Sequence, residues 1–428
     1  MVVGTIIGAS IFVQPSLVSG AVPSVTGMLL VWAAAGVLTL IGALVTAELA
    51  SAFPGTGGVY VFLRESYSPA VGFLWCWAMF WSMHTGIIAA IAMVCARYIG
   101  FFVPLDDTGV RLVAVAVILA LSAVNYVGVR YGTAVQTTFT IIKVAAVVLI
   151  AVAGLTAGRA PAASDVTAGA ASMPSLGAFL TATVAGLFAF GGWHMVTYTG
   201  DETVDARRTI PRALLIGTLV VTASYIAVNA AYLAVLSPPA MAASTRVAAD
   251  FADRLLGSGG AAAMSSLVVL STVGALTGII LTGPRVYLAA AQDGLLFRWI
   301  GDVHPRFGTP HHAIALQAVW ASVLVATGTY RALFTRVVYT EWIFFGMMAA
   351  GIFILRRRAS YAPGYRAWGH PVLPAIFIVA TAAIVINQLA TEPMESVTGL
   401  LIVLAGLPLY YLRTSRRASS PSVPNADR

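Results

Sequence analysis

The chain has 428 residues, of which 59% are hydrophobic and only 9% are charged, and its mean hydropathy is +0.89. Soluble proteins carry about 25% charged residues, so these values exclude a soluble globular protein and predict a polytopic membrane protein. The net charge of +8 does not indicate nucleic-acid binding, because the arginines stand in short segments between apolar stretches, where they set topology. Cys76 and Cys95 lie in one apolar segment and predict neither a disulfide framework nor a metal site.

Apolar segments long enough to cross a bilayer, about 17–25 residues each, recur along the whole chain. They predict twelve membrane-spanning helices, at about residues 2–20, 25–52, 70–100, 111–129, 133–157, 175–200, 210–237, 261–289, 312–329, 337–355, 371–390 and 396–412. If the N-terminus is cytoplasmic, most arginines, Arg207, Arg208 and Arg356 among them, fall on the cytoplasmic side. This asymmetry predicts that both termini are cytoplasmic, as an even number of spans requires.

The first segment contains an interruption, Gly4-Thr5-Ile6-Ile7-Gly8-Ala9-Ser10. Glycines at this spacing either let helices pack closely or mark a break in the helix. The segment begins at residue 2 without a preceding polar stretch, and we expect the start to be truncated or misassigned. No cleavable signal peptide is evident, because the stretch continues through Gly and Pro without an A-x-A-like site.

Lys143 is the single lysine of the chain and lies in the fifth segment. It stands about ten residues into the predicted helix, or about 15 Å deep at 1.5 Å per residue. A charge near the centre of the bilayer costs at least about 2.5–3.5 kcal/mol and marks an ion or proton pathway by default. Lys143 therefore either carries a proton or replaces a bound cation, or its ammonium ties the fifth helix to carbonyls of the first.

The sixth segment carries a second interruption, Phe188-Ala189-Phe190-Gly191-Gly192-Trp193. Each glycine costs about 1 kcal/mol against alanine in a helix interior. In a bilayer a broken helix is tolerated only where the break is buried in protein or lines a cavity. Breaks at matching positions of two halves indicate the binding site of a secondary transporter. Backbone N–H groups there favour a carboxylate and carbonyls favour an ammonium, which together suit an amino acid.

The loop at residues 158–174 separates two groups of five predicted helices. The sequence therefore predicts one transmembrane domain with a first repeat at 1–157 and a second at 175–358. Two further helices at 371–412 and a cytoplasmic tail at 413–428 complete it.

Residues beside the second break would set side-chain selectivity. Phe188, Phe190 and Trp193 are aromatic and no acid is visible in the pocket, so we expect neutral rather than cationic substrates. His84 and His194 each either contact substrate or titrate, or form a hydrogen bond between helices. A bis-His haem between them has no supporting motif.

Other charged residues suggest structural roles. Glu48, late in the second helix, is interpreted as bonding to the following loop, with a proton site as the alternative. Asp201 and Glu202 with Arg207 and Arg208 form either a cytoplasmic gate or a solvated cluster. No metal-ligand spacing and no cofactor motif is present, so we expect neither a metal nor an organic cofactor.

Six stretches of the chain match the pattern of a known family: GTIIGASIFVQP, LVWAAAGVLTLIGALVTAELASAFPGTGGVYVFL, TIIKVAAVV, GLFAFGGWHMVTYTGDETVDARRTIPRAL, PRVYLAAAQDGLL and GLPLYYL. They resemble the amino acid–polyamine–organocation superfamily, and in particular its L-type amino acid transporter branch. The resemblance implies an all-α fold of twelve helices, with a five-plus-five inverted repeat, broken helices one and six, and alternating access.

The resemblance also implies roles for individual residues. It assigns substrate binding to Ile7, Gly8, Ala9, Ser10, Ile11, Phe188, Ala189, Phe190, Gly191 and Trp193. Phe188 resembles the aromatic gate over the substrate. Lys143 resembles a lysine thought to stand in for a sodium ion.

The chain departs from the family pattern at three places. Gly8-Ala9-Ser10 replaces the usual Gly-Ser-Gly, which puts a side chain where close backbone approach is expected, and His194 replaces the usual Asn. Animal relatives bind a glycoprotein subunit through a cysteine after the third helix. The corresponding loop, about Val103 to Val110, has no cysteine, so no disulfide-linked partner is expected.

We therefore expect a transporter of small neutral amino acids in the plasma membrane, working as an exchanger or a proton-coupled symporter. The alternatives are a polyamine or organic-amine antiporter and an amino acid sensor that does not transport. A membrane enzyme is disfavoured, because the spans lack paired acids and a His-rich cluster.

Overall fold

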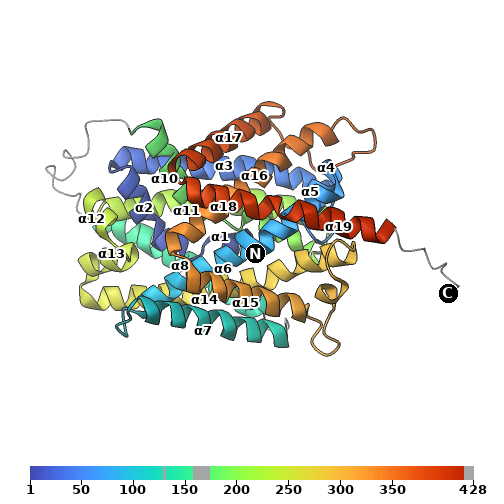
Figure 1. The fold of residues 1–428 in the computed structure, drawn as a ribbon. Helices are drawn as coiled ribbons and strands as arrows, with labels where there is room; N and C mark the ends of the chain where they lie inside the picture. Colours follow the sequence, from blue (N-terminus) through green and yellow to red (C-terminus); the bar gives the residue numbers. More distant parts are fainter. Residues whose placement is uncertain (129–131, 158–173, 419–428) are drawn as a thin grey trace.

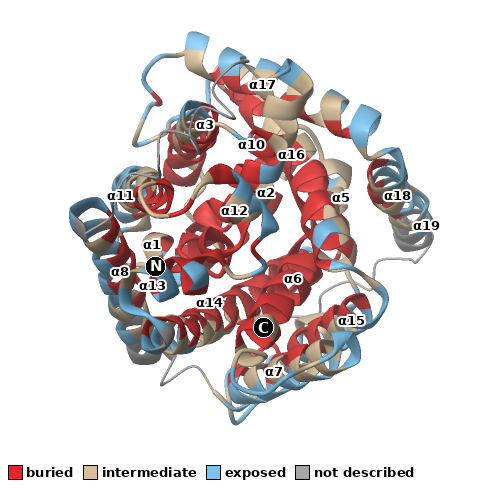
Figure 2. Cartoon of the chain, turned by 90° about the vertical axis from the view of Figure 1, so that its left-hand side faces the viewer, coloured by how far each residue is buried: buried red, intermediate tan, exposed pale blue. Residues whose placement is uncertain are grey.

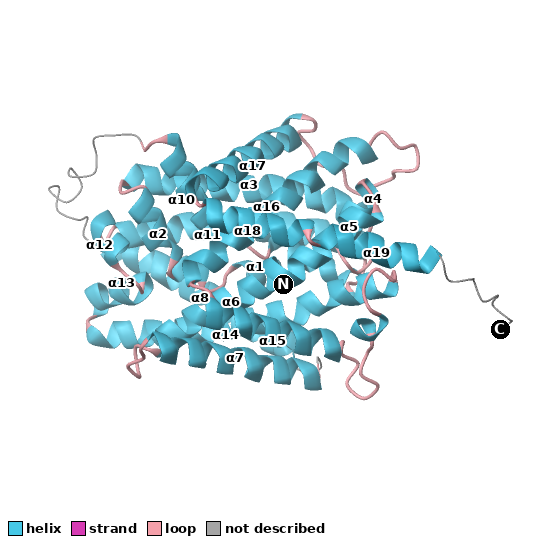
Figure 3. Cartoon of the chain, in the orientation of Figure 1, coloured by secondary structure: helices cyan, strands magenta, loops and turns pink. Residues whose placement is uncertain are grey.

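In the computed structural model, residues 1–128, 132–157 and 174–418 are described, and all regular elements within these ranges are helices (Figure 3). The predicted all-α class is confirmed. The helices are α1 Val2–Ile6, η1 Ser10–Phe12, α2 Gln14–Ala21, α3 Val25–Ala52, α4 Val59–Ser66, α5 Pro69–Ala78, η2 Met79–Met83, α6 His84–Ile99, α7 Asp107–Val127, α8 Gly132–Ala157, α10 Leu176–Ala189, η3 Trp193–Glu202, α11 Ala206–Leu233, α12 Pro238–Ala243, α13 Val247–Leu256, α14 Ser258–Gln292, η4 Arg298–Gly301, α15 His311–Thr327, α16 Tyr330–Leu355, α17 Val372–Thr391, α18 Pro393–Leu404 and α19 Gly406–Ala418.

The predicted membrane spans coincide with these helices. Within the described ranges, 10 helical segments are long and apolar enough to cross a membrane, and α15 is a shorter apolar helix. The first predicted span is the broken run from α1 to α2. The chain is therefore an integral, polytopic membrane protein.

The tenth span begins earlier than predicted. The helix α16 starts at Tyr330 rather than near residue 337, and the Thr329 side chain caps it by accepting a hydrogen bond from the Ala332 N–H. Arg331 and Arg336 made its first turns look like a loop. Both arginines are paired, with Glu392 at 2.9 Å and with Glu395 at 2.5 Å, which lets the helix begin among charges.

The third span contains a π-helical turn that the sequence did not predict. It is η2, Met79–Met83, between α5 and α6. Thr85 donates its hydroxyl to the Phe80 carbonyl at 2.7 Å, which occupies one carbonyl within this turn. Such turns widen a helix locally and are frequent at functional sites.

The long helices run side by side along one axis (Figure 1). We call the end that carries α4 the α4 end, and the opposite end, which carries α12 and α13, the α12 end. Seen along this axis, buried residues gather on the inner helices and exposed ones on the rim (Figure 2). In the most apolar part of the segment Pro69–Ile99, 89% of the residues are buried, whereas in the most apolar part of Pro393–Leu412 only 22% are buried. Anything polar near the middle of this bundle is therefore enclosed by protein rather than lipid.

The sequence did not predict the short helices α4, α12 and α13, because they lie between spans. At the C-terminal end, α19 continues to Ala418, past the predicted start of the tail at residue 413. Residues 158–173 of the predicted loop and residues 419–428 of the tail fall outside the described residues. So do Arg130 and Arg159, two of the arginines between the predicted spans.

Candidate functional site

The first span is broken where the sequence predicted. The helix α1 ends at Ile6, and Ile7 has φ −69° and ψ 88°, which is not helical. Helical backbone resumes as η1 at Ser10. Ile7 and Ile11 are fully buried, so the break lies inside the protein, as an interruption at membrane depth must.

The sixth span is broken beside it. The helix α10 ends at Ala189, and Gly192 has φ 93°, a left-handed conformation that favours glycine. A Cβ at Gly192 would stand 3.0 Å from the Thr5 carbonyl oxygen, so a side chain there would push the two breaks apart. The paired breaks are thus confirmed, and Gly192 allows their close approach.

Tyr225 of α11 joins the two breaks, and the sequence analysis missed it. Its hydroxyl lies 3.0 Å from the Ile6 carbonyl oxygen and 3.2 Å from the Ala189 carbonyl oxygen, and it donates to them. Each carbonyl belongs to the last turn before a break, and carbonyls in the last turn of a helix have no N–H donor within that helix. One fully buried side chain therefore fixes the position of α1 relative to α10.

Lys143 lies against the first break. The residue is 2% exposed, and its ammonium donates to the Gly4 carbonyl oxygen at 3.3 Å. The sequence analysis gave such a contact as one of its alternatives, in which the lysine ties the fifth span to the first. It holds α1, the half-helix on the α4 side of the break.

A small cavity of about 20 Å³ lies between the breaks. It is lined by Thr5, Ile6, Gly8, Ser10, Ile87, Ile91, Phe188, Ala189, Gly191, Gly192, Met195, Ile279, Val337 and Glu341. A single water needs about 10–15 Å³, so an amino acid fits only after side chains move.

Half of the predicted binding residues reach this cavity. Gly8, Ser10, Phe188, Ala189 and Gly191 line it, and Ile7, Ala9, Ile11, Phe190 and Trp193 are not among its lining residues. Phe190 packs instead against Tyr225, with ring centroids 5.0 Å apart, and Trp193 against Phe345 at 5.1 Å.

The expectation of a pocket without an acid is wrong. Glu341 of α16 lines the cavity and is 5% exposed. It was missed because nothing in an apolar helix marks which face looks inward, and α16 is distant in sequence from both breaks. The other lining residues are apolar, hydroxyl-bearing or glycine.

Phe188, in the wall of the small cavity, contacts Phe334, which lines a second, larger cavity at the α12 end. Its ring packs against Phe334, with centroids 5.5 Å apart, and against Tyr330 at 6.3 Å. The second cavity has about 290 Å³, and Phe334, Arg331, Gln388 and Glu392 contribute to its wall. All three aromatic residues are 5% exposed, so this closure is dry.

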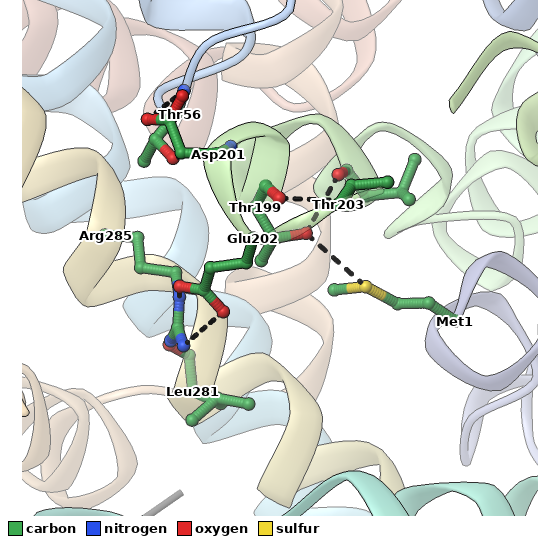
Figure 4. Close-up of polar contacts among 9 residues, drawn as sticks. Met1, Thr56, Thr199, Asp201, Glu202, Thr203, Leu281 and Arg285 are labelled. Carbon is green, nitrogen blue, oxygen red and sulfur yellow. Dashed lines mark hydrogen bonds and ion pairs between the residues drawn. The ribbon is translucent and has the colours of Figure 1, made fainter. Parts of the chain in front are cut away.

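The closure at the α4 end is ionic. Arg285 of α14 donates to Glu202 at 2.7 and 3.1 Å, and the Thr56 N–H donates to Asp201 at 3.0 Å (Figure 4). The partner of Glu202 is thus Arg285 rather than Arg207 or Arg208, both of which are exposed.

A second acid strengthens this closure from the end of α14. Asp293 accepts hydrogen bonds from Tyr60 and from Arg64, both on α4. Burial, together with the Asp293 carboxylate, raises the pKa of the Tyr60 hydroxyl, so Tyr60 stays protonated and donates.

The two histidines lie beside the cavity rather than in its wall. Nε2 of His84 is 2.8 Å from the Ile279 carbonyl oxygen, which is the predicted bond between helices. His194 is packed among aromatic rings, with Phe345 at 4.9 Å, and its Nδ1 has no partner among the described residues.

Glu48 has the structural role that the sequence favoured, but with a more distant partner. Its carboxylate is fully buried and is bound by Arg356 at 2.9 and 2.5 Å and by the Ala367 N–H at 2.7 Å. These groups come from the loop after α16, not from the loop after α3.

Comparison with known proteins places these features in a family. The sequence profile described as "Amino acid permease" matches residues 1–411. The chain is 32% identical to the large neutral amino acids transporter small subunit 2 of Homo sapiens, over 96% of this chain and 78% of that protein. It is 32% identical to the serine/threonine exchanger SteT of Bacillus subtilis, over 98% of this chain and 96% of that one. It is 31% identical to the Asc-type amino acid transporter 1 of Mus musculus, over 96% and 79%.

Proposed function

Because the chain belongs to the amino acid permease family and is an amino acid transporter, we propose that it carries small neutral amino acids across the plasma membrane by alternating access. The observation that carries this proposal is the pair of helix breaks around one enclosed cavity. Their backbone groups bind the two charges that every amino acid shares. The N–H groups at the start of η1 and η3 receive the carboxylate, and the carbonyls at the ends of α1 and α10 receive the ammonium.

The size of the cavity supports a small substrate. Its present volume of about 20 Å³ is bounded by large side chains, Phe188, Met195 and Ile279 among them. Rotation of Phe188 would join it to the 290 Å³ cavity at the α12 end. The substrate side chain then occupies space beside Phe188, which acts as the gate.

Two unlike closures on either side of the cavity support alternating access. Separation of Phe188 from Phe334 opens the α12 end, which we assign to the outside. Separation of Glu202 from Arg285 opens the α4 end, which we assign to the cytoplasm together with both termini. The spans at 1–157 and 175–358 form the two inverted repeats that exchange these states.

Exchange is the mode that the contacts of Lys143 favour. With its ammonium on the Gly4 carbonyl, the lysine serves as a fixed cation for the α1 half-helix. A proton-coupled symport would instead need a group that gains and loses a proton in each cycle. The chain is proposed to act without a disulfide-linked subunit, because Cys76 and Cys95 are both buried.

Uptake into proteoliposomes tests the proposal. A panel of labelled neutral amino acids is offered with and without unlabelled amino acid inside, and with and without a pH gradient. Uptake that requires internal amino acid supports an exchanger. Uptake into empty vesicles driven by the gradient would replace exchange by proton symport, and no uptake of any neutral amino acid would overturn the proposal.

A further inference from the structure

Glu341 is the one acid that the described residues place in the wall of the cavity, and the transport proposal above gives it no task. It lies on α16 one turn after Val337, which lines the same cavity. Residues at i and i+4 share one face of a helix. Arg336, which directly precedes Val337 in the chain, forms an ion pair with Glu395 of α18. The helix therefore presents Glu341 inward, while its other charged residues face other helices.

The carboxyl has no resident counterion. It is 5% exposed and, among the described residues, makes no hydrogen bond or ion pair. The cations of the surrounding bundle are held elsewhere: Lys143 on the Gly4 carbonyl, Arg285 on Glu202, Arg336 on Glu395 and Arg356 on Glu48. A buried carboxyl without a donor is unfavourable, so its presence in a ligand cavity indicates that a ligand supplies the donor.

The two breaks already account for the backbone of the substrate. The ammonium and the carboxylate of an amino acid are matched by groups from α1, α10, η1 and η3, whereas Glu341 comes from a different helix. The remaining part of the substrate is its side chain. Glu341 shares the cavity lining with Phe188 and with Val337, which lies one turn before it on α16, and this is where that side chain is expected.

We propose, on the basis of the amino acid transport proposed above, that Glu341 is a specificity-determining residue that accepts a hydrogen bond from an N–H or O–H group on the substrate side chain. The site then prefers amino acids with a side-chain hydroxyl over apolar ones of the same shape, whereas a preference for a side-chain ammonium would make the substrates cationic rather than neutral. A site built to hydrogen-bond a substrate group rejects the analogue that lacks it far more strongly than a hydrophobic pocket rejects a missing methylene.

Pairs of isosteric competitors test this assignment. Each competitor is tested for its inhibition of labelled alanine uptake into proteoliposomes. Threonine is compared with valine, which lacks its hydroxyl, and ornithine is compared with norvaline, which lacks its ammonium. For the wild-type protein we expect the donor-bearing member of at least one pair to inhibit about tenfold better or more. A preference for threonine identifies a side-chain hydroxyl as the donor, and a preference for ornithine identifies a side-chain ammonium as the donor.

Two variants and a matched control complete the experiment. Glu341→Leu should bring the inhibition ratio within the preferred pair to about one, each ratio being measured against that variant's own alanine uptake. Glu341→Gln keeps an acceptor without the charge, so it should keep a hydroxyl preference and lose an ammonium preference. Glu395→Gln removes an acid that lies outside the cavity and pairs with α16, and it should change neither ratio. If Glu341→Leu does not give a monodisperse protein, Glu341→Ala replaces it, because it also removes the acceptor and should also lose the preference.

Several results would overturn the assignment. They are equal inhibition within both pairs by the wild-type protein, an unchanged preference in Glu341→Leu, and an equal loss of affinity for both members of a pair. The last would mean that Glu341 binds the common α-ammonium. Absence of uptake of every neutral amino acid in the panel by the wild-type protein would overturn the proposed function and this assignment with it, whereas uptake without preference would overturn the assignment alone.

Discussion

The two closures of the cavity use opposite chemistry. At the α12 end Phe188, Phe334 and Tyr330 are each 5% exposed and pack ring against ring. At the α4 end Arg285 and Glu202 form an ion pair in which the arginine side chain is 9% exposed and the glutamate side chain is 55% exposed. An aromatic contact excludes water and depends on shape, whereas an ion pair that is open to solvent on one side is weakened by salt. We therefore expect one end to open by rotation of a side chain, and the other by separation of the charged ends of helices.

The largest expected effect comes from Lys143→Ala, which removes the support of the α4 closure. Without the ammonium on the Gly4 carbonyl, α1 is free to move away from η3 while the aromatic closure stays intact. A hydrogen bond to a charged group contributes about 1.5–3 kcal/mol, so we expect transport to fall at least about tenfold. Uptake by folded, membrane-inserted protein measures it. Wild-type transport by the variant would remove Lys143 from the mechanism.

Phe188→Ala tests the other closure. Loss of the ring removes the contact with Phe334 and one wall of the substrate cavity. Burying an aromatic side chain contributes about 1.5–3 kcal/mol, so the apparent affinity for a neutral amino acid should weaken about tenfold. A concentration series of uptake measures this. Phe102→Ala, which truncates a 49% exposed ring away from the cavity, serves as the control. An unchanged apparent affinity in Phe188→Ala would exclude Phe188 as the gate.

Tyr225→Phe tests the joint between the two closures. The variant keeps the ring but leaves the Ile6 and Ala189 carbonyls without their donor, which should lower the free energy of unfolding by about 1–3 kcal/mol. The control is Tyr232→Phe on the same helix, because the Tyr232 hydroxyl is buried and has no partner among the described residues. Thermal unfolding in detergent compares them. Equal stability of the two variants would contradict the bridging role of Tyr225.

Local chemistry explains what the sequence revealed. Two adjacent glycines in an apolar run, and the single lysine of the chain in another, are visible without any tertiary information. The second break followed from these glycines, and the approximate spans followed from the apolar segments of spanning length. Gly192 adds a detail that only the structure supplies, since its φ of 93° is set by the approach to Thr5.

The residues that the sequence did not reveal act across long separations. Tyr225, Glu341 and Arg285 belong to helices whose partners lie tens to hundreds of residues away in the chain. In a soluble helix the polar face marks the side that looks away from the core. A membrane helix is apolar toward lipid and toward protein alike, so periodicity does not indicate which face meets the cavity. The π-helical turn η2 shifts the helical register as well, and no residue type announces it.

The smallest expected effect belongs to the ion pair, and its salt dependence distinguishes the two closures best. In a protein with Cys76→Ala and Cys95→Ala, the substitution Ser10→Cys places a thiol in the cavity wall, and its labelling rate reports opening. An exposed pair contributes about 0.2–1 kcal/mol, so adding Glu202→Gln should speed labelling only about two- to fivefold. Raising the salt concentration should speed labelling more when Glu202 is present than in Glu202→Gln, because the variant lacks the Arg285–Glu202 pair and leaves the Arg64–Asp293 pair for salt to screen at this end. Phe188→Ala should also speed labelling, yet the increase should not depend on salt, since no charge takes part in the aromatic contact. If salt acted equally with and without Glu202, this pair would not close the α4 end, and the contacts of Asp201 with Thr56 and of Asp293 with α4 would have to hold it.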